Sequence, residues 1–422
     1  MKKLIKLLMV LALLVTPLFA NGTSETKTQN DSVVTINFPT FCIGVNTMAP
    51  WMEERVKTFN KTYVGKYKVE IEEIPGDQNY VNKMKVLYAS DSLPDVMYTG
   101  GQNLLDMMKD KIVDLTPYVD SQWESTMSEG GIVVNSRDGK LLAIPCPKQE
   151  IGYFYNIDLF KKAGIKVPAT TWDEFFKQCK QLKAAGITPV SMDTADSGWV
   201  TSLMMCAMIA SDDAGAKFMN TRLPKNYNTP EFINAANNIQ KLFMNYTTIN
   251  AIGGKYENAA SNFYMGQTAI IANGPWMIPS FYDDTMVSPG FAKKVGTAKF
   301  PGNTMYNSGE IGFSVCAKSA EKIKASIAFV KFLTSEESQK LMLEKTGNTP
   351  DNPNVTSEKS KPLVTEIIRN AISAKHKIND FQSLWYANVV DEISVQYPLL
   401  AKGKISGEEF ATILSNKAKE NL

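Results

Sequence analysis

The sequence predicts an α/β fold made of two lobes with mostly parallel sheets. Short apolar strands alternate with helices between residues 33 and 98, a pattern typical of βαβ units. The length of 422 residues exceeds that of one ordinary domain, which is about 100 to 150 residues, and therefore favours two domains or more. Apolar residues make up 44% of the chain, which is ample for a packed core.

The first elements follow from the spacing of apolar residues. Residues 33–38 alternate between apolar and polar and predict a strand, after which Pro50 opens an amphipathic helix. A second strand is expected at 69–74, a second helix through 81–87 and a third strand at 95–98. This alternation is the basis for the predicted parallel pairing.

Capping signals mark two helices further along the chain. Thr171 and Glu174 have the spacing of a capping box, and Gly186 is expected to end that helix. Thr334 is predicted to open a later helix by the same logic, and Gly347 to end it.

The N-terminus predicts export. Three early lysines precede the apolar run 7–15, and a short segment follows that suits cleavage after Ala20, so residues 1–20 are interpreted as a signal peptide. The apolar run is too short to cross a bilayer, which takes about 20 residues. Residues 21–31 are polar and without pattern, as expected of a flexible tether.

Charge and cysteine content exclude several classes of partner. The formal net charge of +2 becomes −1 once the three lysines of the signal are removed, and charges of both signs are well mixed. Without a basic stripe, neither nucleic acid nor an anionic membrane is an expected partner. The five cysteines lack C-x-x-C and zinc-ligand spacing, so we expect small buried side chains and no essential disulfide.

The residues needed for catalysis or cofactor binding are scarce. His376 is the single histidine, which argues against most catalytic triads and multi-histidine metal sites. The phosphate-binding glycine motifs are missing, so no cofactor and no metal is expected. A carboxylate pair as in glycosidases would remain, but acids near loops also bind sugar hydroxyls or cap helices. The acids near loop signals are Glu150, Asp193, Asp196 and Glu310.

Three of the six tryptophans follow small or polar residues in loop-like segments: Trp199, Trp276 and Trp385. An indole can cover the apolar face of a pyranose while nearby polar groups take its hydroxyls. The alternative is that these indoles fill the seam between lobes. Together they favour an aromatic-lined receptor for a small polar solute over an enzyme.

A set of short phrases, in order along the chain, carries a family resemblance. The phrases lie at 93–96 (Leu-Pro-Asp-Val), 138–145 (Asp-Gly-Lys-Leu-Leu-Ala-Ile-Pro), 168–175 (Pro-Ala-Thr-Thr-Trp-Asp-Glu-Phe), 266–276 (Gly-Gln-Thr-Ala to Gly-Pro-Trp), 347–350 (Gly-Asn-Thr-Pro) and 384–386 (Leu-Trp-Tyr). In this order and spacing the chain resembles the family 1 extracellular solute-binding proteins of ABC importers, the maltose-binding-protein-like group that binds carbohydrates.

The resemblance implies a two-lobed clamp that closes by hinge bending around a solute. Transferred by position, the first lobe holds about 31–148 and 314–374, and the second about 149–313 and 375–422. The implied partners are a sugar or short oligosaccharide and a membrane permease driven by a cytoplasmic ATPase, with the receptor acting as a monomer.

The resemblance also implies ligand contacts. Trp276 and Trp385 correspond to sugar-stacking positions, and Trp199 to a looser third one. We expect Asp193, Gln149 and Glu310 to take hydroxyls. The candidates from the first lobe are the loop 40–46, the turn 98–102 and the crossing 149–153, which includes Tyr153.

Related receptors that are lipoproteins carry a cysteine directly after the signal, and this chain has Asn21 there. We therefore expect a soluble periplasmic protein.

Two alternative functions stay open. One is the same clamp for a polyamine, a glycerophosphodiester or ferric ion, although an iron site needs paired tyrosines and we expect Tyr153 and Tyr155 to face opposite sides. The other is a secreted glycosidase.

Overall fold

The computed structural model describes residues 33–100 and 104–421. The predicted signal peptide, 1–20, and the tether, 21–31, lie outside these ranges and stay predictions. Among the described residues, every helix is too short or too polar to cross a lipid bilayer.

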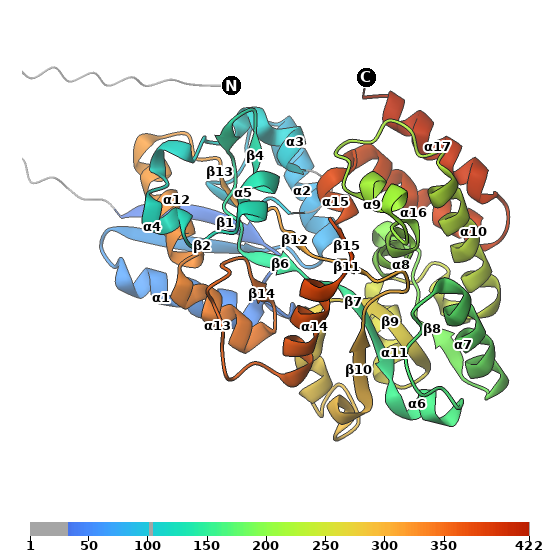
Figure 1. The fold of residues 1–422 in the computed structure, drawn as a ribbon. Helices are drawn as coiled ribbons and strands as arrows, with labels where there is room; N and C mark the ends of the chain where they lie inside the picture. The colour runs from blue at the N-terminus through green and yellow to red at the C-terminus, as the bar shows by residue number, and fades with distance from the viewer. Residues whose placement is uncertain (1–32, 101–103, 422) are drawn as a thin grey trace, which may run out of the picture. The chain divides into compact units, whose positions relative to one another are not determined.

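Two separate clusters of buried apolar side chains divide the described chain into two lobes (Figure 1). The first cluster takes its residues from Ile36 to Cys146 and from Ile311 to Met342. The second takes them from Ile151 to Tyr306 and from Leu343 to Ala418. The chain thus crosses between the lobes three times, and the predicted two-lobed α/β class is confirmed.

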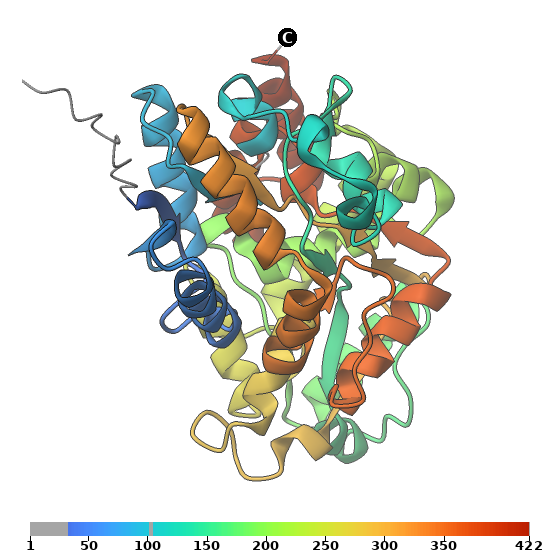
Figure 2. The ribbon, with the colours of Figure 1, turned by 90° about the vertical axis from the view of Figure 1, so that its left-hand side faces the viewer.

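The first lobe is built around two short pairs of strands. β1 (Val34–Thr40) and β2 (Tyr67–Glu73) run parallel, and β3 (Val96–Tyr98) pairs antiparallel with β13 (Phe313–Val315). Figure 2 shows that α12 (Ala320–Leu333) and α13 (Glu336–Thr346) lie beside α1 (Ala49–Thr62), although they come from distant parts of the chain. The remaining elements are α2 (Asp77–Ala89), α3 (Leu104–Met108), α4 (Ser121–Glu124), α5 (Glu129–Asn135), β4 (Ser136–Arg137) and β5 (Lys140–Leu141).

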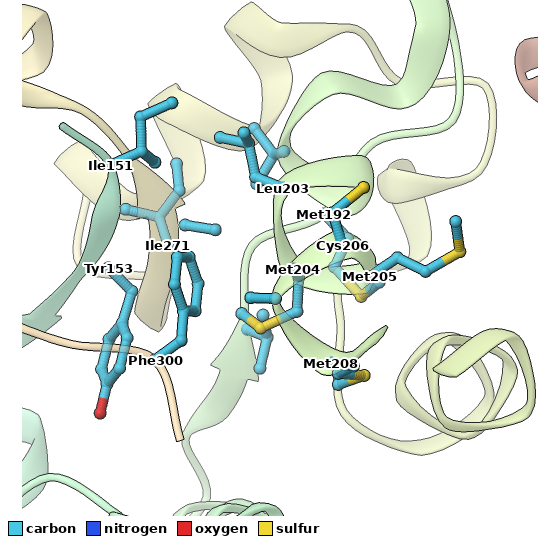
Figure 3. Close-up of a cluster of buried hydrophobic side chains, with 14 of the residues drawn as sticks. Ile151, Tyr153, Met192, Leu203, Met204, Met205, Cys206, Met208, Ile271 and Phe300 are labelled. Carbon is cyan, nitrogen blue, oxygen red and sulfur yellow. The ribbon is translucent and has the colours of Figure 1, made fainter. Parts of the chain in front are cut away.

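The second lobe has a four-stranded sheet in the order β10-β7-β9-β8. Its central strand β9 is buried along its whole length, and α8 packs against it (Figure 3). The strands are β7 (Gly152–Asn156), β8 (Thr188–Val190), β9 (Thr268–Asn273) and β10 (Val295–Ala298). The helices are α6 (Ile157–Lys162), α7 (Trp172–Ala184), α8 (Trp199–Ile209), α9 (Asp213–Met219), α10 (Pro230–Asn245), α11 (Tyr256–Tyr264), α14 (Pro362–Ser373), α15 (Phe381–Leu384), α16 (Ala387–Ala401) and α17 (Gly407–Lys419).

Short strands lie near the places where the chain passes between lobes. β6 (Pro147–Gln149) pairs antiparallel with both β12 (Ser308–Gly309) and β14 (Thr349–Pro350). β11 (Thr304–Tyr306) pairs parallel with β15 (His376–Ile378). These pairings bring residues near 149, 310 and 380 into one region.

Two parts of the fold differ from the predictions. The sheets are mixed and not mostly parallel, because strands such as β13 and β9 return from late in the chain and run against earlier neighbours. The assignment of 314–374 to the first lobe is wrong for its last part. α14 packs on β10, and its buried residues, among them Ile367, belong to the second cluster.

The predicted cap of α7 and the predicted end of α13 are confirmed, although the Glu174 carboxylate accepts from Thr170 and does not complete a capping box with Thr171. Thr171 accepts the Glu174 N–H at 3.2 Å, and Gly347 ends α13 in the left-handed region with φ of 72°. The prediction for Thr334 is wrong. Ser335 caps α13, while the Thr334 hydroxyl donates to the carbonyl of Val330 at 2.9 Å and closes α12.

Candidate ligand-binding site

Trp199 stands at the start of α8, directly after an unusual turn. Three residues before it, Asp196, Ser197 and Gly198, have positive φ angles of 51°, 68° and 53°. Such backbone is costly for residues other than glycine and persists only where the surroundings enforce it. A Cβ on Gly198 would lie 2.5 Å from the ring of Tyr397, so glycine is also required by space.

Side-chain contacts from three segments hold this turn. Gln382 donates from Nε2 to Ser197 Oγ at 3.1 Å, and the Ser202 hydroxyl donates to the Ser197 carbonyl at 3.1 Å. Lys255 pairs with Asp196 at 3.1 Å. The turn is therefore fixed by residues from α8, the start of α11 and α15, and Trp199 is presented on a constrained backbone.

Asp193 stabilises the first turn of α8. Its carboxylate is buried and accepts the N–H groups of Val200 at 3.3 Å and Thr201 at 3.1 Å. Helix N-termini leave such donors unpaired, and Gly198 at the N-cap offers no side chain to take them. Burial raises the pKa of Asp193 to about 7, and these hydrogen bonds oppose the rise. The predicted hydroxyl-binding role does not fit a carboxylate engaged in this way.

Trp276 lies partly exposed in the 3-10 helix η5 (Pro275–Tyr282), directly after β9. Its ring covers Gly274, where a Cβ would come within 2.1 Å of the indole. Asn273, at the end of the strand, donates to the Tyr256 hydroxyl at 3.3 Å. The strand end and Gly274 therefore set the position of the indole.

The structure brings Trp199 and Trp276 together. Their ring centroids are 6.5 Å apart with an interplanar angle of 42°, and both indoles are partly exposed. Trp199 also lies against the buried Phe381, at 5.9 Å between centroids. We call Trp199 and Trp276 the indole pair.

Trp385 lies in the core of the second lobe and not in this site. Its side chain has no exposed surface. The expectation that it stacks on a solute is wrong for this conformation, because other aromatic rings cover it. Ring centroids around it are those of Tyr227 at 5.0 Å, Phe381 at 5.6 Å, and Phe218 and Phe232 at 6.1 Å.

Tyr153 is also a core residue. It is 1% exposed and packs edge-on against Phe175, with 6.4 Å between ring centroids. The Phe300 ring lies 5.9 Å away, and both Tyr153 and Phe300 are labelled in Figure 3. A side chain buried in this way presents almost no surface to a solute, so the structure does not support the predicted ligand contact. The rings of Tyr153 and Tyr155 lie 6.5 Å apart on one side of β7, so the expectation of opposite faces is wrong, since residues two apart in a strand share a face.

Gln149 and Glu310 lie next to each other where the chain passes between lobes. The Tyr98 hydroxyl of the first lobe donates to the Glu310 carboxylate, and the Glu310 N–H donates to the Pro147 carbonyl of β6 at 3.4 Å. Gln149 is 7% exposed, and its Oε1 has no hydrogen-bond partner among the described residues. Burial raises the pKa of Glu310 to about 7, and the nearby charge of Asp380 adds to the rise.

Two ion pairs join the lobes beside this region. Lys85 of α2 pairs with Asp391 of α16 at 2.8 Å. Asp106 of α3 accepts from Arg137 at 2.7 Å and also contacts Arg222 of the second lobe. We call Lys85–Asp391 and Asp106–Arg222 the interlobe ion pairs.

A metal site is not formed by the described residues, since none of their histidine, cysteine, aspartate and glutamate side chains gather in threes with suitable geometry. His376 is buried and interacts with Asp213 at 2.9 Å and with the Gly302 carbonyl at 3.1 Å, which is a structural role. All five cysteines are buried free thiols.

Sequence reasoning missed three residues of this region: Tyr256, Asp380 and Gln382. Asp380 and Gln382 lie within three residues before the Ser-Leu-Trp-Tyr phrase at 383–386. That phrase was the sequence signal by which they could have been found. Tyr256 opens α11 and carries no comparable signal. Its role depends on the strand end that it meets in space.

The family comparison covers most of the chain. A model of the bacterial extracellular solute-binding protein family matches residues 54–366. Among curated proteins, the chain is 26% identical over 251 residues to a multiple sugar-binding protein of Streptococcus mutans, covering 57% of this chain and 58% of that one. It is 24% identical over 372 residues to an arabinooligosaccharide-binding protein of Bacillus subtilis, covering 85% and 83%.

Solved structures show the same fold. A chitin oligosaccharide binding protein superposes with a TM-score of 0.81 at 21% sequence identity, covering 92% of this chain and 98% of that one. At this identity the similarity establishes the architecture of the two lobes.

Proposed function

Because the chain belongs to the bacterial extracellular solute-binding protein family, we propose that it is the exported receptor of an ABC importer for a sugar or short oligosaccharide. The receptor binds its solute between the lobes and delivers it to a membrane permease driven by a cytoplasmic ATPase. We place it in the periplasm, as a monomer without catalytic activity. The curated relatives that bind sugars support the choice of solute.

The indole pair is the observation that carries this proposal. Two partly exposed indoles, 6.5 Å apart, offer apolar surface of the kind that covers a sugar ring. The turn before Trp199 and the close fit of Trp276 on Gly274 fix both rings before a solute arrives. Fixed contact groups lose less entropy on binding, which favours affinity.

Closure of the lobes is the proposed mechanism. A solute shifts a two-state equilibrium only by its difference in affinity for the two states. Contacts from both lobes at once, such as the indole pair with Tyr98 and Glu310, are available only when the lobes lie together. The closed form is then the one that the permease recognises.

The first experiment is isothermal titration of the mature protein with a panel of mono- and oligosaccharides, polyamines, glycerophosphodiesters and ferric citrate. We expect binding by one class of saccharide. Binding by an amine, phosphate or iron compound alone would keep the fold and overturn the sugar assignment. Release of reducing sugar during incubation would overturn the non-catalytic assignment.

The variant Trp276→Ala tests the indole pair. We expect it to weaken saccharide binding by about 1 to 4 kcal/mol, the range for an aromatic hot spot. Trp172→Ala is the matched control, because Trp172 is a partly exposed indole of the same lobe that packs on Phe175 in α7. Equal losses in both variants, or none in Trp276→Ala, would remove the indole pair from the binding site.

A further inference from the structure

Three hydrogen-bond acceptors come together where the chain passes between lobes. They belong to Gln149, Glu310 and Asp380, which we call the acceptor cluster. One of them, Asp380, directly precedes Phe381, whose ring lies 5.9 Å from that of Trp199 in the indole pair. Gln149 pairs with Ser308, and the Glu310 N–H donates to the Pro147 carbonyl at 3.4 Å. The parallel pairing of Tyr306 with Ile378 brings Asp380 to the same place. Two of their oxygens, Oε1 of Gln149 and Oδ1 of Asp380, are buried and have no hydrogen-bond partner among the described residues.

These unpartnered oxygens stand out because the rest of each side chain is engaged. Asp380 is 2% exposed, and its other oxygen accepts the Ser383 hydroxyl at 3.3 Å. Glu310 is held by the Tyr98 hydroxyl. A buried acceptor without a donor costs free energy, so the arrangement is complete only when a donor enters.

The cluster holds two carboxyl groups, those of Glu310 and Asp380, and burial raises the pKa of both to about 7. Among the described residues, the side-chain partners of these two groups are the hydroxyls of Tyr98 and Ser383, and neither carboxyl forms an ion pair with a lysine or arginine. On the nearby turn, Lys255 is already paired with Asp196 at 3.1 Å. A neutral hydroxyl would donate to one acceptor and would leave the carboxylates without an opposite charge. An ammonium group supplies three hydrogen-bond donors and a positive charge.

Resting on the proposed function, we infer that the solute is an amino sugar whose protonated amine binds the acceptor cluster while its ring lies on the indole pair. The two sites match the two chemistries of such a solute, one apolar ring face and one cation. A linear polyamine would supply the cation but would leave the indole pair without a sugar ring to cover.

Titration calorimetry with four probes tests this: the β-1,4-linked glucosamine dimer, its N,N'-diacetyl form, the unsubstituted glucose dimer and spermidine. We expect the glucosamine dimer to bind at least about tenfold more tightly than the other two sugars, as charge-assisted hydrogen bonds allow. Equal or tighter binding of a neutral dimer would overturn the inference and keep the receptor. If spermidine bound and none of the three sugars did, both the amino-sugar inference and the proposed sugar-receptor function would be overturned.

The variant Glu310→Gln locates the preference. It should remove most of the advantage of the glucosamine dimer over the neutral dimers, because it removes the charge that favours an ammonium group and keeps the size of the side chain. Glu366→Gln is the control, since Glu366 is a partly buried acid of α14 outside the cluster. A preference that survives both Glu310→Gln and Asp380→Asn would overturn the inference. The comparison of probes on the unaltered protein does not depend on whether a variant folds.

Discussion

Raising the pH from 5 to 8 should lower the free energy of unfolding of this protein, and the titration of Asp193 should account for a measurable share of that loss. Burial raises the pKa of its carboxyl from 3.8 to about 7. Between these two values the unfolded chain has lost the proton and the native state still holds it. The native state therefore binds more protons there, and the free energy of unfolding falls as the pH rises.

The magnitude follows from the shift. One pKa unit corresponds to about 1.4 kcal/mol, so the full effect of one such group approaches about 4 kcal/mol above pH 7. Part of it has already developed at pH 5, which leaves about 2 to 3 kcal/mol between pH 5 and pH 8. This is a large part of a typical stability of about 5 to 15 kcal/mol.

Urea unfolding followed by tryptophan fluorescence at both pH values measures this change. In Asp193→Asn, which cannot ionise, the loss between pH 5 and pH 8 should be smaller by about 2 to 3 kcal/mol. The control is Asp212→Asn, because Asp212 is an exposed helix cap in the same lobe that accepts the Gly215 N–H at 2.8 Å. If the Asp193→Asn variant lost as much stability between pH 5 and pH 8 as the unaltered protein, the assignment of this titration to Asp193 would be wrong.

Three further predictions concern other parts of the second lobe and its contacts. Gly198→Ala should lower the free energy of unfolding by about 1 kcal/mol or more and weaken saccharide binding, because the positive φ and the nearby Tyr397 ring both oppose a Cβ. An unchanged midpoint of urea unfolding together with an unchanged saccharide affinity would contradict this prediction. Trp385→Ala should cost about 3 to 5 kcal/mol of stability by urea unfolding, as expected of a large buried side chain; a loss below about 1 kcal/mol would contradict its core position. The double variant Arg222→Gln with Asp391→Asn should remove the interlobe ion pairs and increase the radius of gyration of the ligand-free protein in X-ray scattering. The control Lys318→Gln breaks the ion pair with Asp91 within the first lobe and should leave the radius unchanged. Equal radii in the unaltered protein and both variants would contradict a role of the interlobe ion pairs in closure.

The candidate site was only partly predictable from sequence. The partly exposed position of Trp276 could be predicted because a buried strand ends at Asn273 and Gly-Pro then turns the chain, which are local signals. Trp385 follows a similar loop-like phrase but lies among four aromatic rings contributed by residues between 218 and 381. Local sequence does not show which distant side chains will cover a residue.

The sequence by itself determined the α/β class, the two lobes and helix ends such as Thr171 and Gly347, because caps, periodicity and chain length act over a few residues or over the whole composition. Only the tertiary structure decided that Asp193 serves a helix start, that Trp199 meets Trp276, and that Glu310 meets Asp380. Exposure, pairing and pKa depend on which side chains the folded chain brings together, and many of these, such as Trp199 and Trp276, lie far apart in the sequence.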